Sequence, residues 1–138
     1  MSKKLYLYGS GGHAKVLIDT ALGLRMEIQG LFDDNHALWQ QDFYAQKVLG
    51  GQTALKKADN KIQFVIAIGS NEVRRKIAQD LKGISFATLL HESSIVSSSA
   101  QIGEGTVTMA GAAINSDVKI GKHCIINTHA SVDHDCEI

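Results

Sequence analysis

The C-terminal part of the chain repeats an apolar position every six residues. Counting in sixes from Leu90 to Ile138 reaches nine positions, of which eight are aliphatic and one is threonine. A small or medium side chain lies two positions before each of the later ones, and a turn-forming or polar residue often follows. A fixed six-residue period predicts a parallel β-helix, in which each hexad forms one short strand and one turn.

Three such hexads complete a triangular coil of about 18 residues, and the next coil stacks on it at about 4.8 Å. We therefore expect Ile114 to lie under Val132. In the same way, we expect Ile120 to lie under Ile138. The alternative is an ordinary meander of short strands, which a period held over nine positions disfavours. The small inward positions include Cys124 and Cys136, so both are predicted to be buried free thiols.

The first part of the chain alternates strand-like apolar runs with helical patterns. This alternation predicts a parallel sheet covered on both faces, that is, an α/β half-Rossmann module. We expect a first domain over residues 1–84 and a β-helix over residues 85–138. A loop is expected over residues 36–45. Expected strands cover residues 4–8, 26–32, 47–49, 64–68 and 84–89, and expected helices cover residues 16–24, 53–58 and 72–81.

A glycine-rich loop separates the first expected strand from the first expected helix. Gly9, Gly11 and Ala14 fit the pattern G-x-G-x-x-G/A, and Asp33 stands about 20 positions further on, as in dinucleotide-binding proteins. The helix N-terminus offers free N–H groups to phosphate. The pattern predicts a nucleotide-type ligand, with a tight turn that binds nothing as the alternative. By itself the motif suggests NAD, but the sheet is short, and half a site holding one nucleotide fits better.

The loops after the first, second and fourth strands are expected to open at one edge of the sheet, because parallel strands share their carboxyl ends. This edge is the predicted binding crevice. The residues expected there are Gly11, Gly12, His13, Asp33, Asp34, Gly69 and Asn71.

A polar cluster near the end of the chain contains the best candidate for a general base. His134 lies two places after an inward position, near a corner of the predicted coil. Histidine has a pKa suited to base catalysis near neutral pH, and a carboxylate from Asp133 or Asp135 could orient its ring. A solvated corner without chemistry is the alternative. The spacings of His123, His129 and His134 differ from compact ligand motifs, so no metal site is predicted.

Charge and hydropathy exclude some partners. Lysine and arginine number 14, as do aspartate and glutamate, which argues against a general electrostatic attraction to nucleic acid or to an anionic membrane. No apolar run approaches the roughly 18 residues that span a bilayer. The N-terminus lacks the apolar core of a signal peptide, so a cytoplasmic location is expected.

The whole sequence resembles the hexapeptide-repeat sugar O- and N-acyltransferases related to sialic-acid O-acetyltransferase. This family includes N-acetyltransferases that act on UDP-linked 4-amino-sugars. The resemblance implies that the β-helix is left-handed. The segments that carry it are residues 8–15, 32–35 and 67–72, His91, and residues 126–136.

The resemblance implies an acetyltransferase that uses acetyl-CoA as cosubstrate and no NAD. The residue matching His134 is then the catalytic base, and the one matching Asp135 supports it. The residue matching Asn127 lies in the acceptor site. Homotrimers and a role in polysaccharide biosynthesis are implied. A UDP-amino-sugar or a sialic-acid-type sugar is the implied acceptor, and the residues that match the sugar-nucleotide site are Gly11, Gly12, His13, Asp33, Asp34 and Gly69.

One departure from the family pattern concerns the β-helix, which in family members continues for several further coils. This chain stops four residues after His134. We therefore expect a fragment that binds a sugar nucleotide but acetylates poorly or not at all. The alternative function is a nucleotide-sugar or dinucleotide-binding module whose β-helix is purely structural. A small NAD(P)-dependent oxidoreductase is disfavoured, because no Tyr-x-x-x-Lys pair is present.

Overall fold

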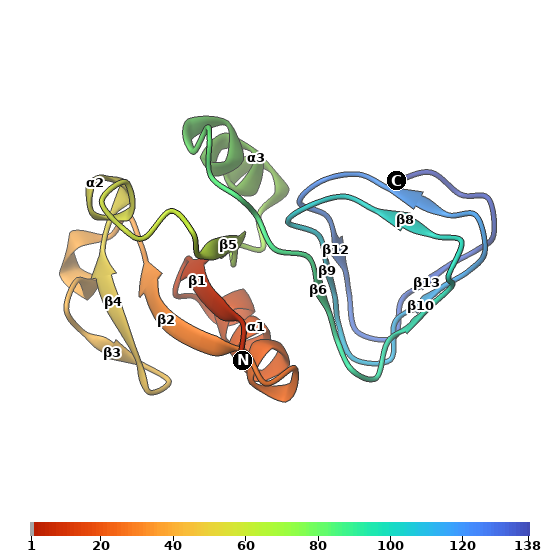
Figure 1. The fold of residues 1–138 in the computed structure, drawn as a ribbon, viewed down its shortest axis with the longest axis horizontal. Helices are drawn as coiled ribbons and strands as arrows, with labels where there is room; N and C mark the ends of the chain where they lie inside the picture. Colours follow the sequence, from red (N-terminus) through yellow and green to blue (C-terminus); the bar gives the residue numbers. More distant parts are fainter. Residues whose placement is uncertain (1) are drawn as a thin grey trace. The chain divides into compact units, whose positions relative to one another are not determined.

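The computed structural model describes residues 2–138. The chain forms two compact units, Met1–Phe86 and Ala87–Ile138. In Figure 1 the first unit runs from red to green, and the second runs from green to blue.

The N-terminal unit is built on a five-stranded sheet with the order β3-β4-β2-β1-β5. All neighbouring pairs are parallel except β3 with β4, so the predicted parallel sheet is confirmed for four strands. Tyr8, Phe32 and Phe64 are buried in its aromatic core, and the Tyr6 ring lies 5.0 Å from that of Phe64. The strands are β1 (Lys4–Tyr8), β2 (Glu27–Phe32), β3 (Asp42–Phe43), β4 (Gln46–Gly50) and β5 (Gln63–Ile66).

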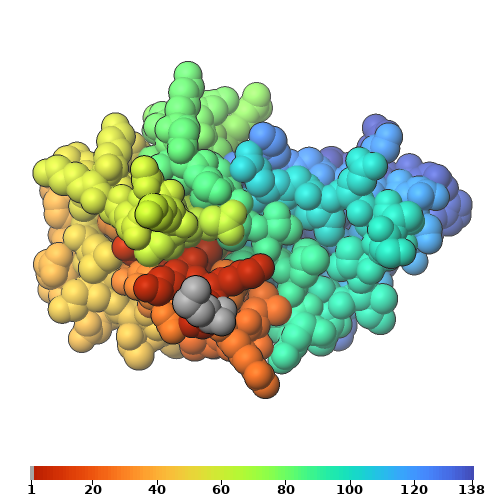
Figure 2. Space-filling view, viewed as in Figure 1, coloured from red at the N-terminus to blue at the C-terminus, as the bar shows by residue number. Residues whose placement is uncertain are grey.

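Three α-helices follow β1, β4 and β5. They are α1 (Gly12–Gly23), α2 (Gln52–Leu55) and α3 (Asn71–Asp80). The hydroxyl of Ser70 caps α3 by accepting a hydrogen bond from the Val73 N–H at 3.3 Å. Figure 2 shows side chains of the α2 region, coloured yellow, on the outer surface of this unit.

The prediction of a plain loop over residues 36–45 is wrong. This segment contains the 3₁₀ helix η1 (His36–Leu38) and the strand β3, which forms a hairpin with β4. The hairpin turn places Tyr44 and Ala45 at φ angles of 49° and 61°. Tight hairpin turns of this kind usually carry asparagine and glycine. The sequence therefore gave no turn signal here, and pairing with β4 decided the structure.

The predicted strand over residues 84–89 is also wrong. Phe86 makes only an isolated bridge to Phe64, and the Phe64 N–H donates to the Ser85 carbonyl at 3.0 Å. The next strand, β6 (Leu89–Leu90), pairs with a strand of the β-helix instead. The apolar run is thus divided between two sheets, which its composition does not reveal.

The C-terminal unit is a parallel β-helix with three-sided coils (Figure 1). Each strand pairs with the strand three places along, so partners such as Ala113 and Ser131 are 131 minus 113, or 18, residues apart. Ile114 pairs with Val132, and the Gly121 N–H donates to the Ile138 carbonyl, as the period predicted. Its strands are β6, β7 (Ile95–Val96), β8 (Gln101–Ile102), β9 (Val107–Thr108), β10 (Ala113–Ile114), β11 (Lys119–Ile120), β12 (Ile125–Ile126) and β13 (Ser131–Val132).

The interior of the coils is mostly aliphatic, with Thr106 and Thr108 also fully buried. Side chains at the inward position and two places before it, such as Ile114 and Ala112, form one buried cluster. Both cysteines are free, and Cys124 is half-buried against this cluster, so its predicted burial is confirmed only in part. Cys136 is exposed, so its predicted burial is wrong. Cys136 lies in the last coil that the structure describes, and it is not among the side chains that pack against the cluster.

The corners of the β-helix contain a second six-residue period that hydrophobicity does not show. One residue at each of six successive corners has a positive φ, a conformation that L side chains rarely adopt. Two of the glycines lie under imidazole rings: a Cβ at Gly105 would approach His123 Nδ1 to 2.2 Å, and one at Gly111 would approach His129 Nδ1 to 2.4 Å. The positive-φ residues are Gly105, Gly111, Asp117, His123, His129 and Asp135.

Candidate functional site

The glycine loop of the N-terminal unit is fixed by the carboxylate of Asp33. Ser10 donates to Asp33 Oδ2 from its backbone N–H at 3.1 Å and from its hydroxyl at 2.6 Å. The other oxygen of Asp33 accepts from the Asn35 N–H at 2.8 Å. One oxygen of Asp33 therefore holds the glycine loop, and the other holds the loop that follows β2. Sequence reasoning missed Ser10, whose only signal is its position between the two glycines.

Asp34 has a different environment from Asp33. One of its carboxylate oxygens accepts a hydrogen bond from the hydroxyl of Tyr8, which is buried, while Asp34 itself is exposed. Burial, followed by the hydrogen bond to Asp34, raises the pKa of Tyr8 well above its ordinary value. The phenol thus remains a donor to Asp34 at any physiological pH, and it orients this carboxylate at the end of β2.

A buried guanidinium shapes the loop after β5. Arg74, only 6% exposed, donates to the carbonyls of Ile68 at 3.0 Å and Gly69 at 3.1 Å, and to the side chain of Asn71. Sequence analysis missed Arg74, because a charged residue in the second turn of a helix usually faces water.

His13 lies between this loop and the glycine loop. A Cβ at Gly69 would come within 4.0 Å of the His13 Cβ. Burial, and secondarily the positive charge of Arg74, lowers the pKa of His13, so its imidazole is neutral at pH 7. Its Nε2 atom is buried and has no hydrogen-bond partner within residues 2–138. A ligand at this edge of the sheet could supply one.

Gly11 and Gly12 leave open space at the start of α1. A Cβ added at either position would meet no atom within 4 Å. The first turn of α1 has no side-chain cap at Gly11. Helix N–H groups beside open space can bind a negatively charged group such as phosphate. The structure thus brings the glycine loop together with Asp33 through Ser10, and with Gly69 through His13.

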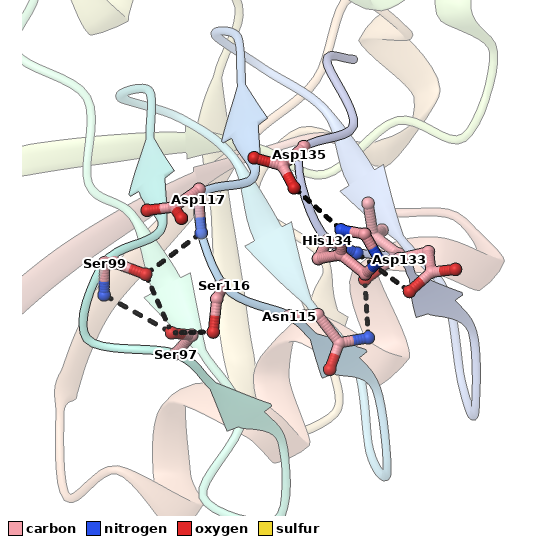
Figure 3. A network of polar contacts seen from close by, with 9 residues as sticks. Ser97, Ser99, Asn115, Ser116, Asp117, Asp133, His134 and Asp135 are labelled. Carbon is pink, nitrogen blue, oxygen red and sulfur yellow. Dashed lines mark hydrogen bonds and ion pairs between the residues drawn. The ribbon is translucent and has the colours of Figure 1, made fainter.

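In the β-helix unit, His134 stands at an exposed corner (Figure 3). Its side chain is 73% exposed, and Nδ1 lies 2.7 Å from Asp135 Oδ2. Asp133 instead accepts a hydrogen bond from the His134 backbone N–H at 2.9 Å. The sequence left open which carboxylate reaches the ring, and the structure places Asp135 there.

The carboxylates raise the pKa of His134, through the hydrogen bond to Asp135 first and the charges of Asp133 and Asp135 next. With Nδ1 donating to Asp135, the lone pair of Nε2 is directed away from that pair. This arrangement of an oriented and exposed imidazole is suited to accepting a proton.

The corner that carries His134 is polar over three coils (Figure 3). One coil before it, the Asp117 N–H donates at 3.0 Å to the hydroxyl of Ser99 on the coil before that. The hydroxyls of Ser97 and Ser116 lie 3.4 Å apart along the same corner. Hydrogen-bonding groups therefore lie along this corner on the two coils before His134.

Other predicted polar residues lie elsewhere in the coil. Asn127 follows β12, one corner before His134, and its side-chain oxygen accepts from the Thr128 N–H at 2.9 Å. His123 and His129 occupy two corners other than that of His134. Among residues 2–138, no group of three histidine, cysteine or acidic side chains is arranged to hold a metal ion. The same residues include no helix long and apolar enough to cross a membrane.

The sequence matches two family models. The PglD N-terminal domain matches residues 4–81, and the bacterial transferase hexapeptide (six repeats) matches residues 99–138. These matches confirm the predicted resemblance to sugar acyltransferases.

Curated proteins that are similar to this chain include the following two. UDP-N-acetylbacillosamine N-acetyltransferase of Bacillus subtilis (strain 168) is 41% identical over 116 residues, which cover 78% of this chain and 52% of that protein. Uncharacterized protein L142 of Acanthamoeba polyphaga mimivirus is 30% identical over 126 residues, or 91% of this chain and 25% of that protein. The chain thus spans a quarter to a half of the length of these relatives.

Solved structures share the fold of both units. The acetyltransferase domain of PglB from Neisseria gonorrhoeae FA1090 is similar with a TM-score of 0.87 and 30% identity, over 99% of this chain and 67% of that one. PerB from Caulobacter crescentus, in complex with CoA and GDP-perosamine, has a TM-score of 0.88 and 35% identity, over 97% of this chain and 64% of that one.

Proposed function

We infer, from the premise that this chain belongs to the PglD N-terminal domain family, that it serves acetyl transfer from acetyl-CoA to the amine of a nucleotide-linked sugar. The observation that carries this proposal is the pairing of His134 with Asp135 at an exposed corner of the β-helix. The Bacillus subtilis relative is an N-acetyltransferase, and the Caulobacter crescentus neighbour holds CoA and GDP-perosamine.

The proposed place of the sugar nucleotide is the carboxyl edge of the N-terminal sheet. There the N–H groups at Gly11 and Gly12 face open space and suit a diphosphate. The neutral His13 offers Nε2 to the ligand, and Gly69 keeps the opposite loop free of a side chain. Asp34 takes the ligand-binding role that the motif assigns to an acid after β2. Asp33 instead holds the glycine loop in position through Ser10.

In the proposed reaction the acceptor amine attacks the thioester carbonyl of acetyl-CoA and gives up a proton to His134 Nε2. A C–N bond forms, the C–S bond breaks, and the thiol of CoA leaves with the proton from the imidazolium. Asp135 keeps the ring oriented and stabilises its positive charge during the transfer. A general base of this kind typically contributes 10²- to 10⁴-fold to the rate.

Several finer features also belong to the proposal. We take the β-helix to be left-handed and the assembly to be a homotrimer, with Asn127 in an acceptor site between neighbouring protomers. Both come from the resemblance to the acyltransferase family. A cytoplasmic location and a role in polysaccharide biosynthesis, supplying an acetylated sugar nucleotide, agree with a CoA thioester as the donor.

A second candidate is a nucleotide-sugar-binding module that does not catalyse. It is favoured by one observation: the phosphate-binding features lie within residues 9–74, whereas the chain covers only 52% of the Bacillus subtilis enzyme. In this case the β-helix would serve assembly alone.

Release of free CoA thiol, followed with UDP- and GDP-linked 4-amino-sugars as acceptors, tests the two candidates. We expect His134→Ala to lower kcat by roughly 10²-fold or more. The matched control is His129→Asn, which changes a histidine at another corner and keeps a residue type that tolerates positive φ. Unchanged turnover in His134→Ala would remove His134 from its role. Calorimetric binding of the sugar nucleotide without any turnover would favour the binding module.

A further inference from the structure

The turn that carries His134 is bound to the coil before it on both sides of the histidine. Asn115 donates twice to the Val132 carbonyl, from its backbone N–H at 3.1 Å and from its side-chain amide at 3.0 Å. On the other side, the Asp135 N–H donates to the Ser116 carbonyl at 3.0 Å. Two adjacent residues of one coil therefore hold the chain before and after His134 (Figure 3).

The side-chain bond of Asn115 has no counterpart at the same place in the other hexads. There the residue after an inward position donates its backbone N–H to the carbonyl one coil further on. Glycine and methionine at this place have no side-chain donor, and the hydroxyl of Ser97 is hydrogen-bonded to those of two other serines. The ring of His91 accepts from the Ser93 N–H within its own turn. The residues compared are His91, Ser97, Gly103, Met109 and Gly121.

The hydrogen bonds inside the turn set its shape. The Cys136 N–H donates to the Asp133 carbonyl at 3.3 Å, which closes a β-turn with Asp135 at a φ of 62°. The Asp133 carboxylate accepts from the His134 N–H at 2.9 Å. These bonds join residues of the turn to one another, so they do not place it on the coil. Its place is set by bonds at its two ends, where Asn115 supplies two of the donors.

The position of the imidazole depends on the position of this turn. The side chain of His134 is 73% exposed, so packing does not hold the ring. Its side-chain partner is Asp135, which belongs to the same turn. A shift of the turn would therefore carry the histidine and its carboxylate together. A displacement of about 1 Å at a catalytic group can lower a rate by about 100-fold.

We propose that Asn115 is a positioning residue for proton transfer, whose side-chain amide holds the peptide that leads into the turn and thereby places His134 toward the acceptor amine. This inference rests on the proposed function, in which His134 takes the proton. In this role Asn115 acts through the backbone of Val132 and does not touch the substrate.

Asn115→Ala tests the proposal, because it removes the side-chain donor, keeps the backbone N–H and changes no charge. Asn115 is exposed, so the variant should fold, which urea denaturation checks. We expect NMR titration to find the pKa of His134 lowered toward its ordinary value, since the pairing with Asp135 loosens. In acetyl transfer, followed by release of CoA thiol, we expect kcat to fall roughly 10- to 100-fold with the KM for the sugar nucleotide unchanged.

Two further variants separate positioning from a general effect on the fold. Ser97→Ala is the matched control, since it changes the same place one coil earlier and should alter neither the pKa of His134 nor kcat. Asn115→Ala is also combined with Asp135→Asn. If Asn115 acts through the histidine–carboxylate pair, it should change the pKa of His134 little once Asp135 is replaced.

An unmoved pKa of His134 in Asn115→Ala would overturn the inference, including in a chain that shows no turnover. A loss of kcat that only follows a loss of stability, with that pKa unmoved, would overturn it as well. In both cases the proposed function would stand as long as His134→Ala abolishes turnover. Full turnover in His134→Ala would remove the base itself, and the role of Asn115 with it.

Discussion

The two units of this chain place their polar side chains in opposite ways. In the N-terminal unit, Asp33 and Arg74 are held by several hydrogen bonds each, and Arg74 is buried. In the β-helix, His134 stands in solvent with one carboxylate partner. A buried polar group without partners destabilises a fold by about 1–3 kcal/mol, whereas an exposed one does not.

The two units therefore differ in whether the residues suited to binding or reaction also stabilise the fold. At the sheet edge of the N-terminal unit, the polar residues form the loops that a ligand would meet, so binding and stability depend on the same side chains. At a β-helix corner, the interior aliphatic residues carry the stability. Ile114 and its neighbours pack in the coil whatever the corner presents. A corner residue such as His134 can therefore serve a chemical role without contributing to the stability of the coil.

The largest effect on stability is expected at the β-helix corner where Gly105 packs against the ring of His123. Gly105→Ala introduces a Cβ 2.2 Å from His123 Nδ1 at a φ of +75°. We expect a loss of about 2–4 kcal/mol in the free energy of unfolding, from overpacking together with the strained φ. Urea denaturation measures it.

The matched change in the N-terminal unit is Gly12→Ala, where the added Cβ meets no atom within 4 Å. It should leave the free energy of unfolding nearly unchanged. Adding His123→Asn to Gly105→Ala should restore part of the loss, because asparagine lacks the ring and tolerates positive φ. Equal stability of Gly105→Ala and Gly12→Ala would show that the corner ring does not pack as described.

A somewhat smaller loss is expected from the buried guanidinium. Arg74→Met keeps an apolar stem but leaves the carbonyls of Ile68 and Gly69 without their donor, so we expect a destabilisation of about 2–3 kcal/mol by urea denaturation. Lys76→Met in the same helix removes an exposed ion pair with Asp80, and should change stability by less than about 1 kcal/mol. Comparable effects of the two substitutions would contradict a structural role for Arg74.

The smallest effect concerns pH, and it has opposite signs in the two units. The pKa of His134 is raised from 6.5, by Asp135 first, and that of His13 is lowered from 6.5, by burial first. NMR titration of the imidazole C–H signals should therefore find His134 still protonated at a pH where His13 is neutral. Asp135→Asn should lower the pKa of His134, while Asp117→Asn, one coil before, should change it little.

The two shifts also give stability opposite pH dependences. The contribution of protonated His134 is present below pH 6.5 and is lost as pH rises through its raised pKa. The contribution of neutral His13 is present above pH 6.5 and is lost as pH falls through its lowered pKa. Identical pKa values for the two rings would contradict both the pairing of His134 with Asp135 and the burial of His13.

The sequence predicted much of the fold because the patterns were local or periodic. The run Lys4–Tyr8 became β1 with its predicted bounds, and the pairing of Ile114 with Val132 followed from the six-residue count. The hairpin of β3 and β4 was missed, because Tyr44 and Ala45 carry no turn signal. The exposure of Cys136 was missed as well, because the repeat specifies a direction and not what covers it.

The sequence by itself determined the coil register and the corner at which His134 stands, since a strict period assigns each residue one place in a repeating backbone. Only the tertiary structure decided which of the two acids after β2 has both oxygens hydrogen-bonded within the protein and which keeps an oxygen free to bind a ligand. Asp33 and Asp34 are adjacent and chemically identical, yet Ser10 and Asn35 occupy the first, while Tyr8 engages one oxygen of the second. Such differences arise from contacts between residues distant in the chain, which no local pattern encodes.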